Sequence, residues 1–167
     1  MASKIKVDQL ETADGSGTIA LQNQLSGMTS ASMPTGSVLQ VVHSSTDFDS
    51  SSSSNVELYS ASITPSATSS KVLILFSCAM QIDSDEYAKL SIYRGSLASG
   101  SAVFTLDDVG FHNSGSAIRQ QASGQYLDSP STTSSQQYSI VGINMGGVTM
   151  RYGAGANNPI TLIEIAG

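Results

Sequence analysis

The sequence predicts an all-β protein, an antiparallel β-sandwich of the jelly-roll type, and three observations lead to this expectation. Short apolar stretches recur along the chain and are separated by turns rich in Gly, Ser and Pro. The 15 Gly and the abundant Ser and Thr disfavour helices. Charged residues are only 12% of the 167 residues, while apolar residues are 40%, so Ser and Thr fill positions that Lys and Glu usually take.

The first 36 residues are expected to form an extension ahead of the main domain. The stretch KIKVDQLE alternates in strand fashion, ADGSG is a turn signal, and TIALQNQL offers a second short strand. A lone hairpin of this size is marginal in water, so it must dock on its own domain, on a sister chain or on another protein. Residues 26–36 indicate a linker closed by Pro34 and Gly36. We therefore divide the chain into an attachment hairpin with linker, 1–36, and a sandwich domain, 37–167.

The main domain contains a succession of expected strands. The apolar run at residues 71–82 is too continuous to face water on one side, which predicts burial on both faces. Residues 46–55, with five consecutive serines, and residues 107–123 are expected to be loops, and Gly146-Gly147 a hairpin turn. The expected strands are SVLQVVHS, VELYSASI, KVLILFSCAMQI, YAKLSIYRG, SAVFTL, QQYSIVGINM, VTMRYG and PITLIEIA.

The last expected strand carries apolar residues on both faces. Ile160 and Leu162 lie on one face, and Ile163 and Ile165 lie on the other. This pattern predicts a sheet partner and a second layer that identical neighbours supply in part. Glu164 then either points inward with Leu162, where its carboxylate needs a partner, or lies in water at the end of the strand. The candidate partners are Arg94, Arg119 and Arg151.

Charge and composition exclude several classes of partner. The formal net charge is −6 and the seven Lys and Arg residues are scattered singly, which argues against nucleic acid. No stretch resembles a signal peptide or approaches the roughly 20 apolar residues of a membrane span, so we expect a protein that is made in a cytoplasm and is soluble there. Cys78 is the single cysteine and is expected to be an inert thiol in the core.

The side chains that carry catalytic or metal chemistry are sparse. No G-x-S-x-G motif occurs, and the two histidines, His43 on an expected strand and His112 in an expected loop, are interpreted as solvated or hydrogen-bonded side chains. The acidic turn at residues 83–86 and the pair Asp107-Asp108 could offer oxygens to Ca²⁺, but the EF-hand pattern is missing. We expect no catalytic residues, no metal site and no cofactor.

The N-terminal segment resembles the attachment segment of many phage fibre and virion proteins. Those segments typically carry an I-x-V-(N/D)-x-(L/I) strand, then an Asp/Ser-Gly turn, then I-x-(L/V). In this chain the stretch that carries the resemblance is KIKVDQLETADGSGTIALQN. The matching positions are Ile5, Val7, Asp8, Leu10, Gly15, Gly17, Ile19 and Leu21.

The remainder of the chain resembles a jelly-roll-like module of phage structural proteins. The stretches that carry this resemblance are SITPSATSSKVLI, SIYRGS, YLDSPSTTSSQQYSI and NPITLIEIAG, which appear in this order and together span most of the domain. The resemblance implies a trimeric, non-enzymatic virion protein. Because the chain has no shaft, coiled coil or repeat, a short fibre, a knob or a capsid decoration protein fits better than a long tail fibre.

The expected function is therefore structural. The N-terminus would anchor the chain to other phage virion proteins, and the jelly roll would form a homotrimer, in keeping with the low charge and the six tyrosines of the sequence. The sequence does not identify the residues of the trimer interface. The alternative is a receptor-binding module that recognises host glycans through the loops at 46–55 and 107–123. The attachment residues would be Ile5, Val7, Leu10, Ile19 and Leu21.

Overall fold

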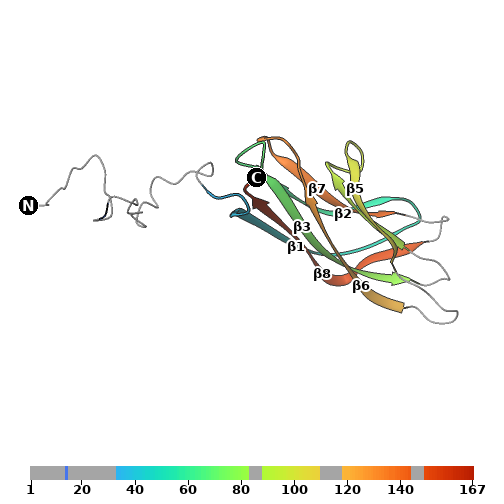
Figure 1. Cartoon of the computed structure of the whole chain (residues 1–167). Coiled ribbons are helices and arrows are strands. Elements are labelled where there is room, and N and C mark those ends of the chain that lie inside the picture. Colours follow the sequence, from blue (N-terminus) through green and yellow to red (C-terminus); the bar gives the residue numbers. More distant parts are fainter. Residues whose placement is uncertain (1–13, 15–32, 83–87, 110–117, 144–148) are drawn as a thin grey trace, which may run out of the picture.

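The computed structural model describes Asp14 and residues 33–82, 88–109, 118–143 and 149–167. These residues form eight strands arranged in two four-stranded antiparallel sheets that face each other, as Figure 1 shows. The expectation of an all-β antiparallel sandwich is confirmed. The expected N-terminal hairpin lies outside the described residues, and the trimer remains a prediction.

Consecutive strands lie in opposite sheets, except β4 and β5, which pair with each other in one sheet. One sheet has the order β1-β8-β3-β6 and the other has the order β2-β7-β4-β5. The bounds of the first four strands are β1 (Val38–Ser52), β2 (Val56–Ile63), β3 (Lys71–Ile82) and β4 (Ala88–Arg94). The bounds of the last four are β5 (Ser101–Val109), β6 (Ile118–Asp128), β7 (Gln136–Ile143) and β8 (Met150–Ile165).

The strand order is that of a jelly roll. Strand β1 pairs with β8, β2 with β7, β3 with β6 and β4 with β5, which is the pairing of one long hairpin rolled into two layers. The remaining contacts, β3 with β8 and β4 with β7, join neighbouring pairs into sheets. The start of β1 and the end of β8 meet at one end of the sandwich, where the amide of Gly36 donates to the carbonyl of Ala166 at 2.7 Å. We call this the proximal end.

The core lies between the two sheets and follows the alternation of the strands. In β3 every second side chain from Val72 to Met80 is buried, and in β4 Leu90 and Ile92 are fully buried. Two aromatic side chains, Tyr138 from β7 and Tyr152 from β8, are the largest of the fully buried residues. Strands from both sheets therefore contribute to a single hydrophobic core.

Two segments expected to be loops are largely strands where they are described. Strand β1 extends through the serine run to Ser52, and its residues pair with β8 from Val38↔Ile165 to Ser52↔Met150. The serines can pair because the ladder uses backbone groups, while β8 supplies the apolar side chains at this level. In the 107–123 segment, β5 continues to Val109 and β6 begins at Ile118. The polar composition of β6 hid it, because it is an edge strand that buries few of its side chains.

Strand β8 is one long element where two separate strands were expected. It runs for 16 residues and is irregular between Tyr152 and Ile160, where it leaves its ladder with β3. There the buried side chain of Asn158 replaces part of that ladder, because its Oδ1 accepts a hydrogen bond from the amide of Ala79 at 2.8 Å. Pro159, which has no amide hydrogen, falls inside this gap and therefore removes no ladder bond to β3.

The expectation that β3 is buried on both faces holds for only one face. Its inward residues are buried, whereas its outward residues Leu73 and Leu75 keep intermediate exposure in the single chain. The same is true of Ile163 and Ile165 in β8. Within the described residues, the outer face of this sheet therefore has no second layer.

Candidate functional site

The outer faces of the two sheets differ in chemistry. On the β1-β8-β3-β6 sheet, outward apolar side chains gather near the proximal end, and three of the four large hydrophobic residues that are clearly exposed in the described chain, Val38, Val41 and Leu127, lie there. On the β2-β7-β4-β5 sheet, polar side chains occupy most outward positions. The first face is therefore the candidate interaction surface.

One row of apolar residues crosses the whole width of this sheet. Val41 pairs with Ile163, Ile163 with Leu73, and Leu73 with Leu127, so each of the four strands contributes one side chain to the row. Val41 and Leu127 at the two edges are 57% and 47% exposed. Neighbouring side chains along the central strands, Leu75 and Ile165, extend the row into a patch. We call these six residues, Val41, Leu73, Leu75, Leu127, Ile163 and Ile165, the outer patch.

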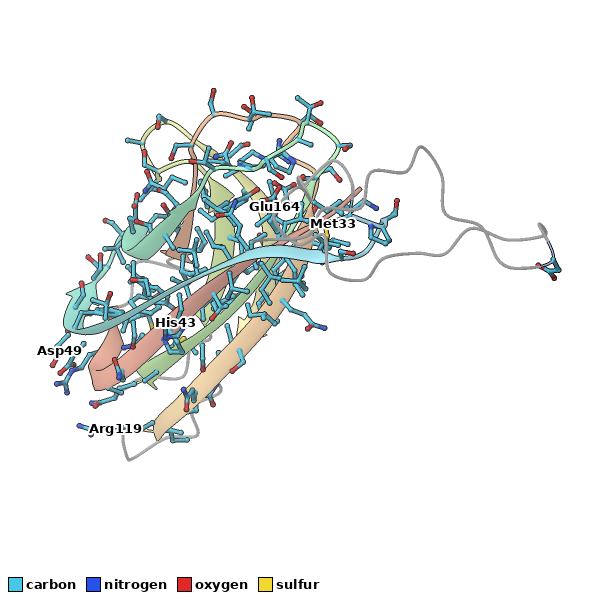
Figure 2. All side chains as sticks on the ribbon, turned by 90° about the vertical axis from the view of Figure 1, so that its left-hand side faces the viewer. Met33, His43, Asp49, Arg119 and Glu164 are labelled. Carbon is cyan, nitrogen blue, oxygen red and sulfur yellow. The ribbon has the colours of Figure 1, made fainter. Side chains whose placement is uncertain are left out.

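Toward the distal end of the sheet, the outer patch is followed first by residues with hydroxyl groups and then by charged residues. Next to the row, His43 and Thr161 pair across β1 and β8, and a hydrogen bond of 2.9 Å joins His43 Nδ1 to Thr161 Oγ1. Figure 2 shows His43 between the proximal end, marked by Met33 and Glu164, and the distal end, marked by Asp49 and Arg119. The patch therefore lies nearer than the distal strand ends to the point where the chain enters β1.

The outer face of the opposite sheet is polar and internally bonded. The Glu57 carboxylate accepts hydrogen bonds from the amide of Leu97, from Gln137 Nε2 and from Ser139 Oγ, at 2.8, 3.2 and 3.0 Å. A further hydrogen bond of 2.9 Å joins the hydroxyls of Ser91 and Thr105. These side chains satisfy one another, so this face offers less apolar surface to a partner.

Glu164 points into the proximal end of the sandwich, as one of the two sequence alternatives predicted. Its side chain is buried, at 1% exposure, and its Oε1 accepts hydrogen bonds from the amide and hydroxyl of Ser66 and from the hydroxyl of Ser70, each at 2.7 Å. Its Oε2 accepts from Gln40 Nε2 at 2.6 Å. The expected arginine partners are wrong, because serine and glutamine donors solvate this carboxylate instead.

The three arginines proposed for Glu164 bind other groups. Arg94 forms a two-point ion pair with Asp128, through Nε at 2.8 Å and through Nη2. Arg119 Nε donates to Gln81 Oε1 at 2.9 Å, and Arg151 forms a two-point ion pair with Asp49. Because guanidinium groups reach far along a strand, sequence spacing alone did not show which carboxylate each would meet.

The hydrogen bonds of Glu164 outweigh the effect of its burial on its ionisation. Burial raises the pKa of the carboxyl group, but the donors Ser70, Ser66 and Gln40 together hold that pKa below its usual value. The Arg94–Asp128 pair is a second buried carboxylate site, and Tyr138 Oη also donates to Asp128 there, at 2.7 Å. Hydrogen bonding to Asp128 raises the pKa of Arg94. Both carboxylates are saturated with donors, which suits a structural role.

The cysteine and acidic residues considered for chemistry have structural surroundings where they are described. Cys78 is fully buried, as expected, and burial raises the pKa of its thiol to about 12. Asp107 forms an ion pair with Lys89 at 2.6 Å. Among the described residues, no group of three or more His, Cys, Asp or Glu side chains could hold a metal ion. His112 and residues 83–86 lie outside the described part.

A small pocket opens at the proximal end, beside the end of β8. Its volume is about 210 Å³, and its lining includes Met33, Leu39 and Ala166. Ser70 also lines it, but the hydroxyl of Ser70 is engaged by Glu164. The pocket thus presents no strong polar anchor for a ligand.

The residues expected to attach the chain to a particle are not part of the described structure. Ile5, Val7, Leu10, Ile19 and Leu21 all fall within residues 1–13 and 15–32, so their role stays a prediction. Sequence reasoning missed the outer patch as a continuous surface. The only signal for it was the apolar residues on both faces of β3 and β8, and the register that aligns them with Val41 and Leu127 appears only in the sheet.

Comparison with solved structures finds similarity, at low sequence identity, to structures from infectious bursal disease virus. No family model matches the sequence. No curated protein matches it either. A subviral particle of VP2 from infectious bursal disease virus aligns with 76% of this chain and 37% of its own, at 15% identity and a TM-score of 0.45. A structure of the Gx strain of the same virus aligns with 77% of this chain and 32% of its own, at 18% identity and a TM-score of 0.45.

This chain thus spans about a third of the length of those viral proteins. In the part of the chain that the structure describes, no helix is long and apolar enough to cross a membrane.

Proposed function

We propose that this protein is a non-enzymatic structural component of a bacteriophage particle. In this proposal it is a homotrimeric short fibre, knob or capsid decoration protein that acts in the virion. Residues 1–36 attach it to other virion proteins, and residues 37–167 form the jelly roll. The residues that make the attachment are Ile5, Val7, Leu10, Ile19 and Leu21.

The observation that carries the proposal is the contrast between the interior and the outer patch. The buried carboxylates Glu164 and Asp128 are each bonded to several donors, so they are poor candidates for acid–base chemistry. At the same time, an apolar row crosses a complete sheet on the outside. A domain with this distribution is suited to contact with other proteins. The resemblance of the N-terminal segment to phage attachment segments is the reason for proposing that the particle is a bacteriophage.

Deletion of residues 1–30 tests the attachment. The shortened chain retains every described strand, so we expect it to fold and to keep the oligomeric state of the full chain. We expect it to be absent from purified particles when it replaces the full chain during infection. Incorporation of the shortened chain at the normal copy number would contradict the proposal. A full-length variant in which Ser replaces Ile5, Val7 and Leu10 controls for the shortening of the chain. We expect this variant, like the deletion, to be absent from purified particles.

A second candidate function is recognition of host glycans, and the topology favours it in one respect. Strands β1, β3, β5 and β7 end, and the four other strands begin, at the end of the sandwich opposite Met33. Eight strand ends therefore gather where an anchored protein points outward. Specific binding of the purified chain to a glycan array, with loss of infection when the purified chain is added as a competitor, would establish this function over a purely structural one.

A further inference from the structure

We infer that the outer patch is the surface through which copies of this chain associate with one another. The inference rests on the proposed function and adds the surface that the sequence left unassigned. The occupant is a second copy of the same chain, whose own outer patch meets the first one. In a cyclic oligomer, the patches of all copies turn toward the common symmetry axis.

The size of the face matches what a stable contact between copies requires. Four strands about 4.8 Å apart, paired over about eleven residues, give a projected area of roughly 700 Å². A standard protein interface buries about 800 Å² on each partner. The patch contributes the apolar part of this area, at its proximal end, and the Ser, Thr and Gln side chains further along the sheet contribute a polar margin on the distal side.

The charge distribution allows identical faces to approach. On the outer face of β3, Lys71 is the charged side chain next to the apolar patch, and it lies at the proximal rim, where it pairs with Ile165. The charged side chains Arg119, Arg151 and Asp49 stand at the distal end, away from the patch. Because like charges do not oppose each other within the patch, copies of this face can approach one another around the symmetry axis without electrostatic repulsion. The outer face of the β2-β7-β4-β5 sheet is polar and internally bonded, so it has no comparable apolar patch that is free of charges.

The position of the patch connects association to anchoring. It lies at the proximal end, close to where residues 1–32 join β1. Copies that meet through this patch bring their N-terminal segments together, so that several attachment segments bind a particle at once. Simultaneous binding of linked segments raises the effective affinity by orders of magnitude without any new contact.

The test places a charge at each edge of the patch. We expect the full chain to be an oligomer at micromolar concentration, with a mass at least twice the 17.3 kDa of one chain. The double variant Val41→Asp with Leu127→Asp is expected to dissociate at least a hundredfold more readily and to be a monomer in light scattering. The matched control is Ser62→Asp with Ala102→Asp, which adds the same charge at exposed positions on β2 and β5, the edges of the other sheet, and is expected to stay oligomeric.

Circular dichroism of the double variant separates lost association from lost folding. A second measurement does not depend on a disruptive substitution: Leu127→Cys is expected to cross-link copies with a short bis-maleimide, whereas Ala102→Cys is not. The native Cys78 is buried and should not react. A double variant that keeps the oligomeric mass, or equal cross-linking at both positions, would overturn the inference.

The outcomes also distinguish this inference from the proposed function. A full chain that is a monomer, yet joins phage particles, overturns the inference and leaves the structural role intact. An oligomer that dissociates in the Asp variant but never joins particles supports the interface and contradicts the role. If deletion of residues 1–32, and not the Asp substitutions, abolishes association, the occupant of the contact is the N-terminal segment and the inference is wrong.

Discussion

The chemistry of single residues is clearest at Glu164, which binds the turn between β2 and β3 to the last strand. Its carboxylate receives the amide and hydroxyl of Ser66 and the hydroxyl of Ser70, so one side chain fixes a segment nearly 100 residues away in sequence. Loss of the charge leaves these buried donors poorly matched. A buried donor without a partner costs about 1–3 kcal/mol.

This arrangement predicts a specific dependence of stability on pH. Because hydrogen bonds hold the pKa of Glu164 below its usual 4.5, ionised Glu164 stabilises the folded state fully above that value. The stabilisation is lost as the pH falls through the lowered pKa. We expect Glu164→Gln to cost about 1–3 kcal/mol of unfolding free energy at pH 7 and progressively less as acid is added. Urea unfolding at several pH values measures this.

The control for this prediction is Asp47→Asn, which removes the carboxylate of an exposed residue on the neighbouring strand β1. It should leave the unfolding free energy at pH 7 nearly unchanged. A Glu164→Gln variant whose deficit is the same at pH 4 and pH 7 would show that the carboxylate charge is not the stabilising feature.

At this scale the sequence indicated orientation but not partners. The alternation of Ile160, Leu162 and Glu164 left two alternatives, an inward carboxylate or one in water, and the structure confirms the inward one. The choice of an arginine partner was wrong because the donors are Ser66 and Ser70, which lie in the connection between β2 and β3. The turn that packs against a given strand end is determined by the way the two sheets fold together. That arrangement depends on contacts between residues far apart in the chain, so local sequence patterns do not show it.

At the scale of elements, β8 shows how one strand can serve two neighbours along different parts of its length. It pairs with β1 almost throughout, but with β3 only on either side of its irregular centre. Gly153 begins that irregular stretch with φ +83°, a conformation that residues with a side chain rarely adopt. A sequence pattern with Gly and Pro inside suggested two strands, because local rules cannot show that β1 bridges the gap.

The irregular centre of β8 yields a prediction from two glycines. Gly155 also has positive φ, +67°, but nothing lies within 4 Å of the position that a β-carbon would take there, so Gly155→Ala should cost only the backbone strain, about 1–2 kcal/mol. At Gly153 the added carbon would overlap the carbonyl oxygen of Phe48 on β1. We therefore expect Gly153→Ala to cost about 3 kcal/mol or more. Denaturant midpoints measure both, and equal costs would argue against a constrained β1–β8 contact.

At the scale of the whole molecule, the fold class was predictable and the surface was not. Strand lengths, turn composition and low charge together specify an all-β sandwich, because each strand must bury one face. The outer patch needs the register of four strands, from Val41 across to Leu127, and only two of these strands looked apolar on both faces in sequence. The oligomer was expected from those strands, but its surface could be located only after the sheets were assembled.

Association through the outer patch makes the stability of the molecule depend on its concentration. Unfolding of an oligomer releases separate chains, so mass action raises the melting temperature as concentration increases. For a domain of this size, each tenfold increase should raise Tm by about 2–4 °C. The Val41→Asp, Leu127→Asp variant should melt at the same temperature at all concentrations, because its folded state is already a monomer. Scanning calorimetry over a hundredfold range of concentration measures this, with the Ser62→Asp, Ala102→Asp variant as the control. If the Tm of the wild-type chain does not change with concentration, the apolar row faces water in the working protein.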